Sequence, residues 1–328
     1  MNGIELTPDQ SVDSIGRLAT RAENAGFDTI FSSCHYNNRD PFLTLSRIAE
    51  TTETVHLGPG VANPYDVHPV RLATQTATLD EISGGRAVMG IGAGDASTLS
   101  NLGVERDRPL GRVLESLQVA RRLWAGERVD HDGTFRVRNA GLNFRPPGTI
   151  PVYVGAQGPH MLRMAGKYAD GVLVNGSHPA DLAWASNRVE EGIDDRPDTL
   201  DSTEFETVAF ASVSVAEDAE AARTMARRPV SFIVAGAAPP VLDRHDLDEE
   251  RAAEIGDAIG AGDFSRADSL VTRSMLDSFA VAGDRRAVRE RFEALLDHAD
   301  GVVVAAPLGP DKETAIGLAG AALDSARE

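Results

Sequence analysis

Short apolar segments rich in β-branched residues alternate along the chain with longer segments that repeat at helical spacing. Eight short segments have the length and composition of buried strands: residues 3–6, 27–33, 55–58, 87–92, 152–155, 171–175, 207–215 and 302–305. This alternation is typical of parallel strands joined by crossover helices. We therefore predict an α/β fold, a closed (β/α)8 TIM barrel with helices on its outside. An open, doubly wound sheet is the alternative, although no Gly-x-Gly-x-x-Gly turn follows the first strand.

Helix boundaries can be predicted from capping residues. Ser11 is suited to cap the first helix, and Gly26 can end it in the left-handed conformation. Further helices are predicted to begin at Pro69, Ala216 and Asp311. The buried face of the first helix is expected to consist of Val12, Ile15, Leu18, Ala19 and Ala22.

The chain of 328 residues is within the size range of single α/β barrels, so we predict one domain spanning residues 1–328. Two segments exceed ordinary βα loops: residues 126–147, and residues 229–279, where additional helices are expected. Long ordered insertions in barrels usually carry binding or assembly surfaces. The acidic segment 194–203 is predicted to be a loose linker.

The charge of the chain is strongly negative, since 32 basic residues against 50 acidic residues give a net charge of −18. Only Lys167 and Lys312 are lysines, and the other 30 basic residues are arginines. A field of this sign repels nucleic acid and makes the folded chain repel itself at low salt. We therefore expect no nucleic-acid partner and predict a halophilic source, the alternative being an acidic protein from an ordinary organism.

The chain has no apolar run of about 18 residues and no signal-peptide pattern, so we expect a cytoplasmic protein without a membrane partner. Cys34 is the single cysteine, which excludes an internal disulfide. A lone buried cysteine is usually inert, so catalysis by Cys34 is disfavoured. His131, His178 and His245 are expected in surface segments without the spacing of metal ligands, and no metal is predicted.

The active site of an α/β barrel lies at the carboxyl ends of its strands, so the residues after each strand are the candidates. Glu5 is the charged residue of an apolar first strand, where a low dielectric disfavours the ionised form and suits a general acid. It is the predicted catalytic residue, and pairing with a barrel arginine is the alternative. Asp95, after the fourth strand, can orient a substrate. His35, after the second strand, is either a polarising group or an ordinary polar residue.

Glycine is concentrated in three loops at strand ends: residues 58–65, 92–95 and 155–158. A residue without Cβ lets backbone N–H groups approach a flat ring or a phosphate closely. Residues 155–158 also precede a predicted helix, whose N-terminus favours an anion. We therefore predict a bound cofactor with a phosphate group. The alternative is that these glycines only form tight turns.

Four motifs occur in an order that resembles one family: GPGVANPY at 58–65, GAGD at 92–95, GAQGP at 155–159 and PLGPDK at 307–312. With residues 232–240 and the pair Arg244-His245, they are similar to the archaeal methylenetetrahydromethanopterin reductases, which are bacterial-luciferase-like barrels. The resemblance covers essentially the whole chain. It implies reversible hydride transfer between reduced deazaflavin coenzyme F-420 and the methylene group of a tetrahydropterin, giving the methyl form. It also implies a homo-oligomer with no metal and no tightly bound flavin.

The resemblance implies roles for individual residues. Glu5 matches the family's acidic residue on the first strand and would protonate the departing nitrogen. Asp95 and Gln157 match polar active-site positions. Gly60 and Val61 match a cis peptide bond behind the deazaflavin ring, a bond that is rare without proline. Cofactor binding is predicted for His35, Gly60, Val61, Asn63, Gly94, Gly155, Ala156, Gln157, Gly158 and Asn175.

One departure from the family pattern affects the substrate. The second strand of relatives more commonly ends in Thr-Asp-His-Tyr-Asn-Asn, whereas here Ser33 and Cys34 precede His35. This change leaves room for a different substrate or donor, and both methylenetetrahydromethanopterin and methylenetetrahydrofolate fit the motifs. Two other hypotheses are a different flavin- or deazaflavin-dependent luciferase-like oxidoreductase, and a flavin-binding or assembly subunit without turnover.

If the acidic surface is an adaptation to salt, the melting temperature of the protein should rise as KCl is added. At about 1 M salt the Debye length is about 3 Å, so repulsion among surface carboxylates is screened. The measurement is thermal unfolding followed by circular dichroism across a KCl series, with an uncharged osmolyte as the control. A melting temperature that falls with added KCl would contradict the halophilic interpretation.

Overall fold

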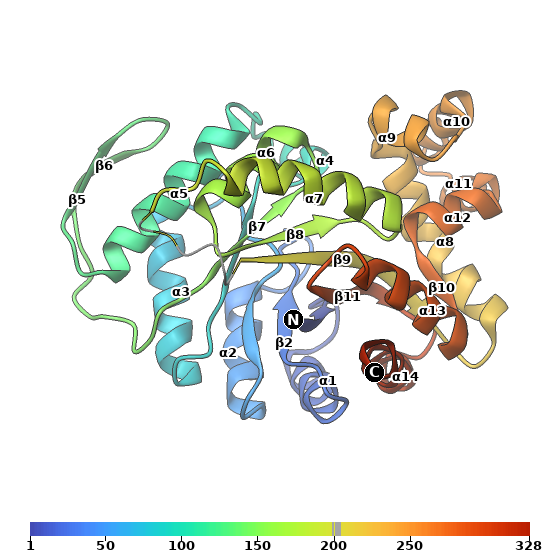
Figure 1. The fold of residues 1–328 in the computed structure, drawn as a ribbon, viewed down its shortest axis with the longest axis horizontal. Helices are drawn as coiled ribbons and strands as arrows, with labels where there is room; N and C mark the ends of the chain where they lie inside the picture. Colours follow the sequence, from blue (N-terminus) through green and yellow to red (C-terminus); the bar gives the residue numbers. More distant parts are fainter. Residues whose placement is uncertain (199, 201–204) are drawn as a thin grey trace.

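The computed structural model describes residues 1–198, 200 and 205–328. Eight parallel strands form a wall in the order β3-β2-β1-β11-β9-β8-β7-β4. A backbone bridge between Leu57 and Ala87 joins the two ends of this wall, so the sheet closes into a barrel surrounded by helices (Figure 1). The barrel strands are β1 Asn2–Leu6, β2 Thr29–Ser32, β3 His56–Pro59, β4 Met89–Gly92, β7 Val152–Ala156, β8 Gly171–Asn175, β9 Glu206–Val215 and β11 Gly301–Leu308.

All eight predicted strands are present, and the predicted TIM barrel is confirmed. A further short strand, β10 Val281–Gly283, was not predicted. It pairs with the carboxyl-terminal end of β9. Successive side chains of a strand point to opposite faces, so each barrel strand packs one set of residues against the helices and another set inside the barrel. The interior cluster consists of Phe31, Val88, Tyr153, Leu173, Val208 and Val303.

The helices cover the outside of the barrel and largely begin where capping residues predict. The helix after β9 begins at Ala219 rather than at Ala216, because the Asp218 carboxylate caps it. No helix in the described part of the chain is long and apolar enough to span a membrane. The helices are α1 Val12–Asn24, α2 Pro41–Thr51, α3 Pro69–Ser83, α4 Ala96–Asn101, α5 Pro109–Trp124, α6 Pro159–Tyr168, α7 Pro179–Ile193, α8 Ala219–Gly236, α9 Pro239–Arg244, α10 Glu249–Gly260, α11 Phe264–Leu270, α12 Arg273–Phe279, α13 Arg285–Leu296 and α14 Lys312–Arg327.

Helix α1 follows its prediction with one exception. The Ser11 hydroxyl accepts the Ser14 N–H and so caps the helix, and Gly26 has a positive φ of 89° just beyond its end. Four of the five expected apolar residues are buried, whereas Val12, at the first position of the helix, is only half-buried. The helix is thus held at both ends by the residues that the sequence indicated.

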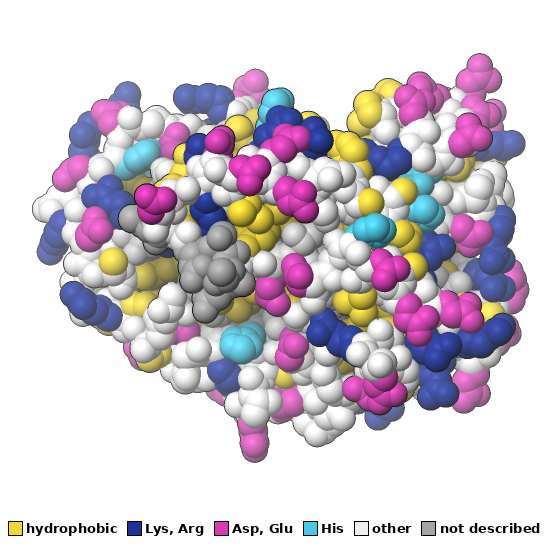
Figure 2. Space-filling view, viewed as in Figure 1, with side chains coloured by type: hydrophobic (Ala, Val, Ile, Leu, Met, Phe, Trp, Pro, Cys, Tyr) yellow, Lys and Arg dark blue, Asp and Glu magenta, His cyan; other side chains and the backbone are white. Residues whose placement is uncertain are grey.

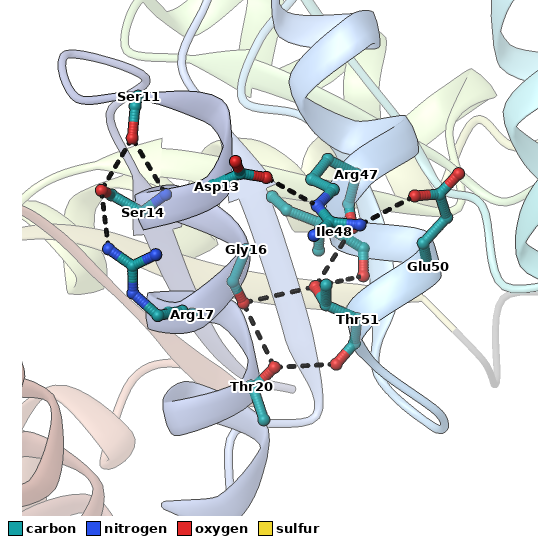
Figure 3. Close-up of polar contacts among 10 residues, drawn as sticks. All are labelled: Ser11, Asp13, Ser14, Gly16, Arg17, Thr20, Arg47, Ile48, Glu50 and Thr51. Carbon is teal, nitrogen blue, oxygen red and sulfur yellow. Dashed lines mark hydrogen bonds and ion pairs between the residues drawn. The ribbon is translucent and has the colours of Figure 1, made fainter.

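Helices α1 and α2 approach each other closely at a glycine. A Cβ atom on Gly16 would lie 3.3 Å from the Thr51 methyl group. At this crossing the Thr20 hydroxyl donates to the Thr51 carbonyl oxygen at 2.8 Å, and the Thr51 hydroxyl donates to the Gly16 carbonyl oxygen at 3.3 Å (Figure 3). These bonds fix α1, and with it the loop that connects β1 to α1, against α2.

The two long insertions lie at opposite ends of the molecule (Figure 1). Residues 126–147 contain an antiparallel hairpin of β5 Val129–Asp132 and β6 Arg136–Ala140. Helices α8 to α12 share a hydrophobic core of their own, which includes Val230, Ile255 and Met275. Pro229, predicted to begin this insertion, lies inside α8. Of the predicted linker 194–203, residues 199 and 201–203 lie outside the described part of the chain.

A buried ionic contact joins the helical insertion to α7. Arg244 donates to Asp181 Oδ1 at 2.7 Å, and His245 Nε2 lies 2.9 Å from Asp181 Oδ2. The His245 side chain is only 3% exposed, so the prediction that it lies at the surface is wrong. Burial raises the pKa of Asp181, but the hydrogen bonds from His245 and Arg244 outweigh burial and hold that pKa below its usual value. A carboxylate with two donors therefore fixes the insertion to the barrel.

Charged side chains of both signs are interspersed over the molecular face in Figure 2. Most surface ion pairs use arginine, for example Arg273 with Asp277. Each lysine also has an acidic partner: Lys312 Nζ lies 2.8 Å from Asp9, and Lys167 Nζ lies 3.7 Å from Asp195. Exposed pairs of this kind contribute at most about 1 kcal/mol each to folding stability. They therefore do not offset the repulsion among the excess carboxylates.

Candidate active site at the carboxyl end of the barrel

Glu5 lies where two neighbouring barrel strands separate. The pairing of β1 with β11 ends at Ile4 and Val304, one residue before Glu5. Further along β11, the Ala306 N–H donates to Glu5 Oε2 at 3.0 Å, and the Thr7 hydroxyl donates to Glu5 Oε1 at 2.9 Å. Glu5 is only 3% exposed. Its partners are an amide and a hydroxyl rather than the arginine that the sequence left as an alternative.

A cavity of about 250 Å³ adjoins Glu5 and Thr7, which form part of its wall. Met225 is 41% exposed and the Asp9 side chain is 44% exposed, so the cavity extends to the protein surface. The apolar part of its lining consists of Leu6, Ile15, Leu18, Met225, Ala306, Pro307 and Leu308. Glu5 is therefore adjacent to a space that lies between the barrel wall and the outer helices.

The loop after β3 runs beside β4, where Ala62 forms a parallel backbone bridge with Ile91. The peptide bond between Gly60 and Val61 is cis, as predicted from the family resemblance. A Cβ atom on Gly92 of β4 would lie 2.7 Å from the Val61 side chain, and one on Gly155 of β7 would lie 3.2 Å from it. A Cβ on Gly90 would also meet Val61, at 3.2 Å. The Val61 isopropyl group thus occupies the space above β4 and β7 that larger residues would fill.

This packing changes the interpretation of the glycine-rich strand ends. A side chain at Gly92 would overlap Val61, and Gly155 lies tightly against the same residue, so packing alone favours glycine at both positions. Gly94 has a positive φ of 69°, and a Cβ there would lie 3.2 Å from the Asn63 side chain. The Asn63 amide donates to Asp66 at 2.8 Å and its carbonyl oxygen accepts two N–H groups of the same loop. Asn63 therefore shapes the loop.

Asp95 and His35 lie at the rim of the mouth. Asp95 caps α4, accepting the Thr98 N–H at 2.8 Å and the Ser97 hydroxyl at 2.5 Å. Burial raises the pKa of Asp95, but these hydrogen bonds outweigh burial, with a smaller contribution from His35, and hold the pKa below its usual value. Asp95 is therefore an ionised carboxylate at neutral pH and not a proton donor.

The N-terminus of α6 is open at the same mouth. Gly158 is its N-cap residue and provides no side chain to bond the first N–H groups of the helix. A helix N-terminus with free N–H groups favours an anion. The neighbouring Gln157 is exposed, and its amide donates to the Asn175 carbonyl oxygen at 3.3 Å, while Ala156 is buried beneath it. The end of β7 is thereby tied to the end of β8.

The end of β2 contains hydroxyl groups that sequence reasoning missed. Ser32 and Ser33 are buried, and their hydroxyl oxygens have no hydrogen-bond partner among the residues that the structure describes. Groups of this kind are rare in folded proteins. Thr7 was also missed, although it lies two residues after Glu5 and alternation along the strand places both on one face.

Cys34 is held as a neutral thiol. Its S–H donates to the Ser32 carbonyl oxygen at 3.6 Å. Burial raises the pKa of the Cys34 thiol far above its usual value, and the negative charge of Asp40 adds to this effect. Because the thiolate is the nucleophilic form, this agrees with the prediction that Cys34 is not a nucleophile.

The histidines outside the mouth have structural partners. His131 lies 2.8 Å from a Glu115 carboxylate oxygen, and the His178 ring packs edge-on against His245 at 5.0 Å. Within residues 1–198, 200 and 205–328, no group of three or more His, Cys, Asp or Glu side chains is arranged to hold a metal ion.

Comparison with known proteins identifies the family. The model of the luciferase-like monooxygenases matches residues 2–302. The chain belongs to this family. The 5,10-methylenetetrahydromethanopterin reductase of Archaeoglobus fulgidus is 42% identical over 324 residues, covering 97% of each chain. The enzyme of the same name from Methanolobus tindarius is 40% identical, covering 97% of this chain and 98% of that protein.

Two solved structures superpose on this chain. The coenzyme F-420-dependent tetrahydromethanopterin reductase from Methanopyrus kandleri superposes with a TM-score of 0.92 and 37% identity, covering 99% of this chain and 98% of that one. An F-420-dependent secondary alcohol dehydrogenase superposes over both full chains with a TM-score of 0.81 at 20% identity, which shows a shared fold alone.

The packing of Val61 over β4 predicts a compensating pair of substitutions. Gly92→Ala should lower the free energy of unfolding by about 1–3 kcal/mol, because the new methyl group would overlap the Val61 side chain. Val61→Ala removes that side chain, so the double variant should recover part of the loss. The measurement is urea unfolding of the two single variants and the double variant. Strictly additive effects would show that Val61 does not pack against Gly92.

Proposed function

We propose that this protein transfers a hydride from the reduced deazaflavin coenzyme F-420 to the methylene group of a methylene-tetrahydropterin, giving the methyl form. The observation that supports this most directly is the buried Glu5 at the barrel mouth, in a chain that matches the methylenetetrahydromethanopterin reductases over 97% of its length. The bridging methylene carbon accepts a hydride only once one of its two C–N bonds opens, and the departing nitrogen then needs a proton. A carboxyl group within an enclosed site is suited to that transfer.

Glu5 is the proposed proton donor to the departing nitrogen. Glu5 Oε2 accepts the backbone N–H of Ala306, and this bond fixes the carboxyl group beside β11. Fixed orientation of a donor lowers the entropic cost of reaching the transition state. Asp95, ionised at neutral pH, is proposed to orient the substrate through hydrogen bonds rather than to exchange protons.

The mouth fits a flat, anionic coenzyme. Val61 presents an apolar surface above Gly92 and Gly155, where a ring can stack without meeting side chains from β4 and β7. The uncapped N-terminus of α6 at Gly158 is suited to a phosphate group. When bound, the coenzyme supplies the hydride. The residues proposed to contact it are His35, Gly60, Val61, Asn63, Gly94, Gly155, Ala156, Gln157, Gly158 and Asn175.

The proposal also includes the assembly, the location and the source of the enzyme. We infer a homo-oligomer in the cytoplasm of a halophilic organism, with residues 1–328 forming one domain. The net charge of −18 and the scarcity of lysine support the halophilic source. The tetrahydropterin is either a methanopterin or a folate, because the residues at the mouth concern the coenzyme and the methylene group that both carriers share.

The proposed reaction is tested by an anaerobic assay in about 1 M KCl, where surface charge is screened. Oxidation of reduced F-420 is followed by absorbance with methylenetetrahydromethanopterin and methylenetetrahydrofolate in parallel. Turnover is expected with at least one carrier, which names the substrate. A folded protein that turns over neither, but reduces another acceptor or uses flavin mononucleotide, would contradict the proposal and favour a different luciferase-like oxidoreductase.

Replacing Glu5 tests the proton donor. Glu5→Gln keeps the size and a hydrogen-bonding carbonyl but removes the acid, so turnover should fall at least about tenfold, while general acids contribute about 100-fold or more. Binding of F-420, measured by fluorescence titration, should change little. The matched control is Glu50→Gln, an exposed carboxylate on α2. Unchanged turnover in Glu5→Gln would remove Glu5 from the proposed role.

A further inference from the structure

The proposed reaction leaves Glu5 without its proton after every forward turnover. One C–N bond breaks, the departing nitrogen takes a proton from Glu5, and the hydride forms the new C–H bond with two electrons from the coenzyme. The oxidised coenzyme releases one proton to solvent, and Glu5 must regain one from solvent. While substrate and coenzyme fill the barrel mouth, water from the mouth cannot reach Glu5.

The structure provides a second approach to Glu5. Beyond Ile4 and Val304 the strands β1 and β11 are no longer paired, so the barrel wall is open beside the carboxyl group. The cavity of about 250 Å³ lies at this gap and includes Glu5 and Thr7 in its wall. Its other side is formed by apolar residues of α1, by Met225 of α8 and by the ion pair of Asp9 with Lys312. Met225 is 41% exposed, so the cavity connects this gap to the surface.

Thr7 is a polar residue of the cavity wall that is hydrogen-bonded to the acid. Its hydroxyl donates to Glu5 Oε1 at 2.9 Å, and the residue is half-buried in the cavity wall. A hydroxyl can donate one hydrogen bond and accept others at the same time. It can therefore pass its own proton to the Glu5 carboxylate while it takes one from a water or a small acid in the cavity. The second Glu5 oxygen accepts the Ala306 N–H, which cannot act in this way.

We propose that Thr7 is a positioning and proton-relay residue that re-protonates Glu5 from this cavity, behind the substrate. The inference rests on the proposed role of Glu5 as proton donor. Thr7 does not contact the reacting atoms. It sets how fast Glu5 is restored between turnovers and not how fast Glu5 protonates the first substrate.

The test compares Thr7→Val with Thr7→Ser. Valine keeps the shape but removes the hydroxyl, and serine restores it. At about pH 9 and low buffer, where proton donors are scarce, steady-state turnover of Thr7→Val should fall at least about tenfold. The single-turnover rate, measured by stopped flow on enzyme equilibrated beforehand, should stay close to that of the unaltered enzyme. Thr7→Ser should recover most of the steady-state rate. Addition of imidazole, a small molecule that can enter the cavity and both donate and accept a proton, should restore Thr7→Val.

Two further variants separate the relay from a structural effect. Met225→Trp should narrow the cavity and slow steady-state turnover without rescue by imidazole. Thr78→Val, which removes an exposed hydroxyl from α3, should leave every rate unchanged. Melting temperature and F-420 binding by fluorescence should be the same in all variants. These two measurements do not depend on turnover and identify a variant that is misfolded or fails to bind the coenzyme.

The outcomes distinguish the two proposals. If Glu5→Gln keeps full turnover, the proposed role of Glu5 fails, whatever Thr7 does. If Glu5→Gln is slow but Thr7→Val turns over at the unaltered rate, the relay alone is overturned. The relay is also overturned if Thr7→Val slows the single turnover and the steady state equally, with no rescue by serine or imidazole, because Thr7 would then only hold Glu5 in place.

Discussion

The barrel mouth depends on one packing constraint, the contact of Val61 with the glycines of β4 and β7. A parallel barrel of eight strands has an interior just wide enough for its own side chains. Here Gly92 and Gly155 place no side chain in the interior, and the Val61 side chain from the loop after β3 occupies that space. The result is an apolar side chain in the space that strand residues would otherwise occupy. In the proposed complex, a flat ring would lie on Val61 rather than on side chains of the strands.

The position of Glu5 depends on a second departure from a regular barrel. In a continuous ladder the Ala306 N–H would bond to the backbone of β1, but here it donates to the Glu5 carboxylate. One side chain therefore satisfies a buried amide and at the same time presents an acid to the mouth. Because a buried amide without a partner costs about 1–3 kcal/mol, removing the carboxyl oxygens would also weaken the wall. Glutamine keeps one such oxygen, so chemistry and stability can be separated at this position.

Local sequence patterns predicted the elements well, because the order of apolar and polar residues within a strand or helix indicates which of its faces is buried. Ser11 and Gly26 affect only backbone a few positions away in the sequence, and the structure confirms the predicted cap at Ser11 and the positive φ at Gly26. The errors concern contacts between distant residues. His245 is buried because Asp181, 64 positions away, accepts its hydrogen bond, and no local signal indicates this. The glycine-rich loops were identified correctly as unusual, but their contact with Val61 could not be derived from spacing.

The helical insertion and the proposed proton path are connected through α8. This helix contributes Val230 and Val234 to the separate core of the insertion and Met225 to the cavity beside Glu5. The position of α8 is set at both ends, by β9 before it and by the contact of Arg244 and His245 with Asp181 after it. A change in the docking of the insertion would therefore alter the width of the cavity without touching the barrel mouth. In the proposed mechanism, the insertion and the restoration of the acid are therefore linked through Met225.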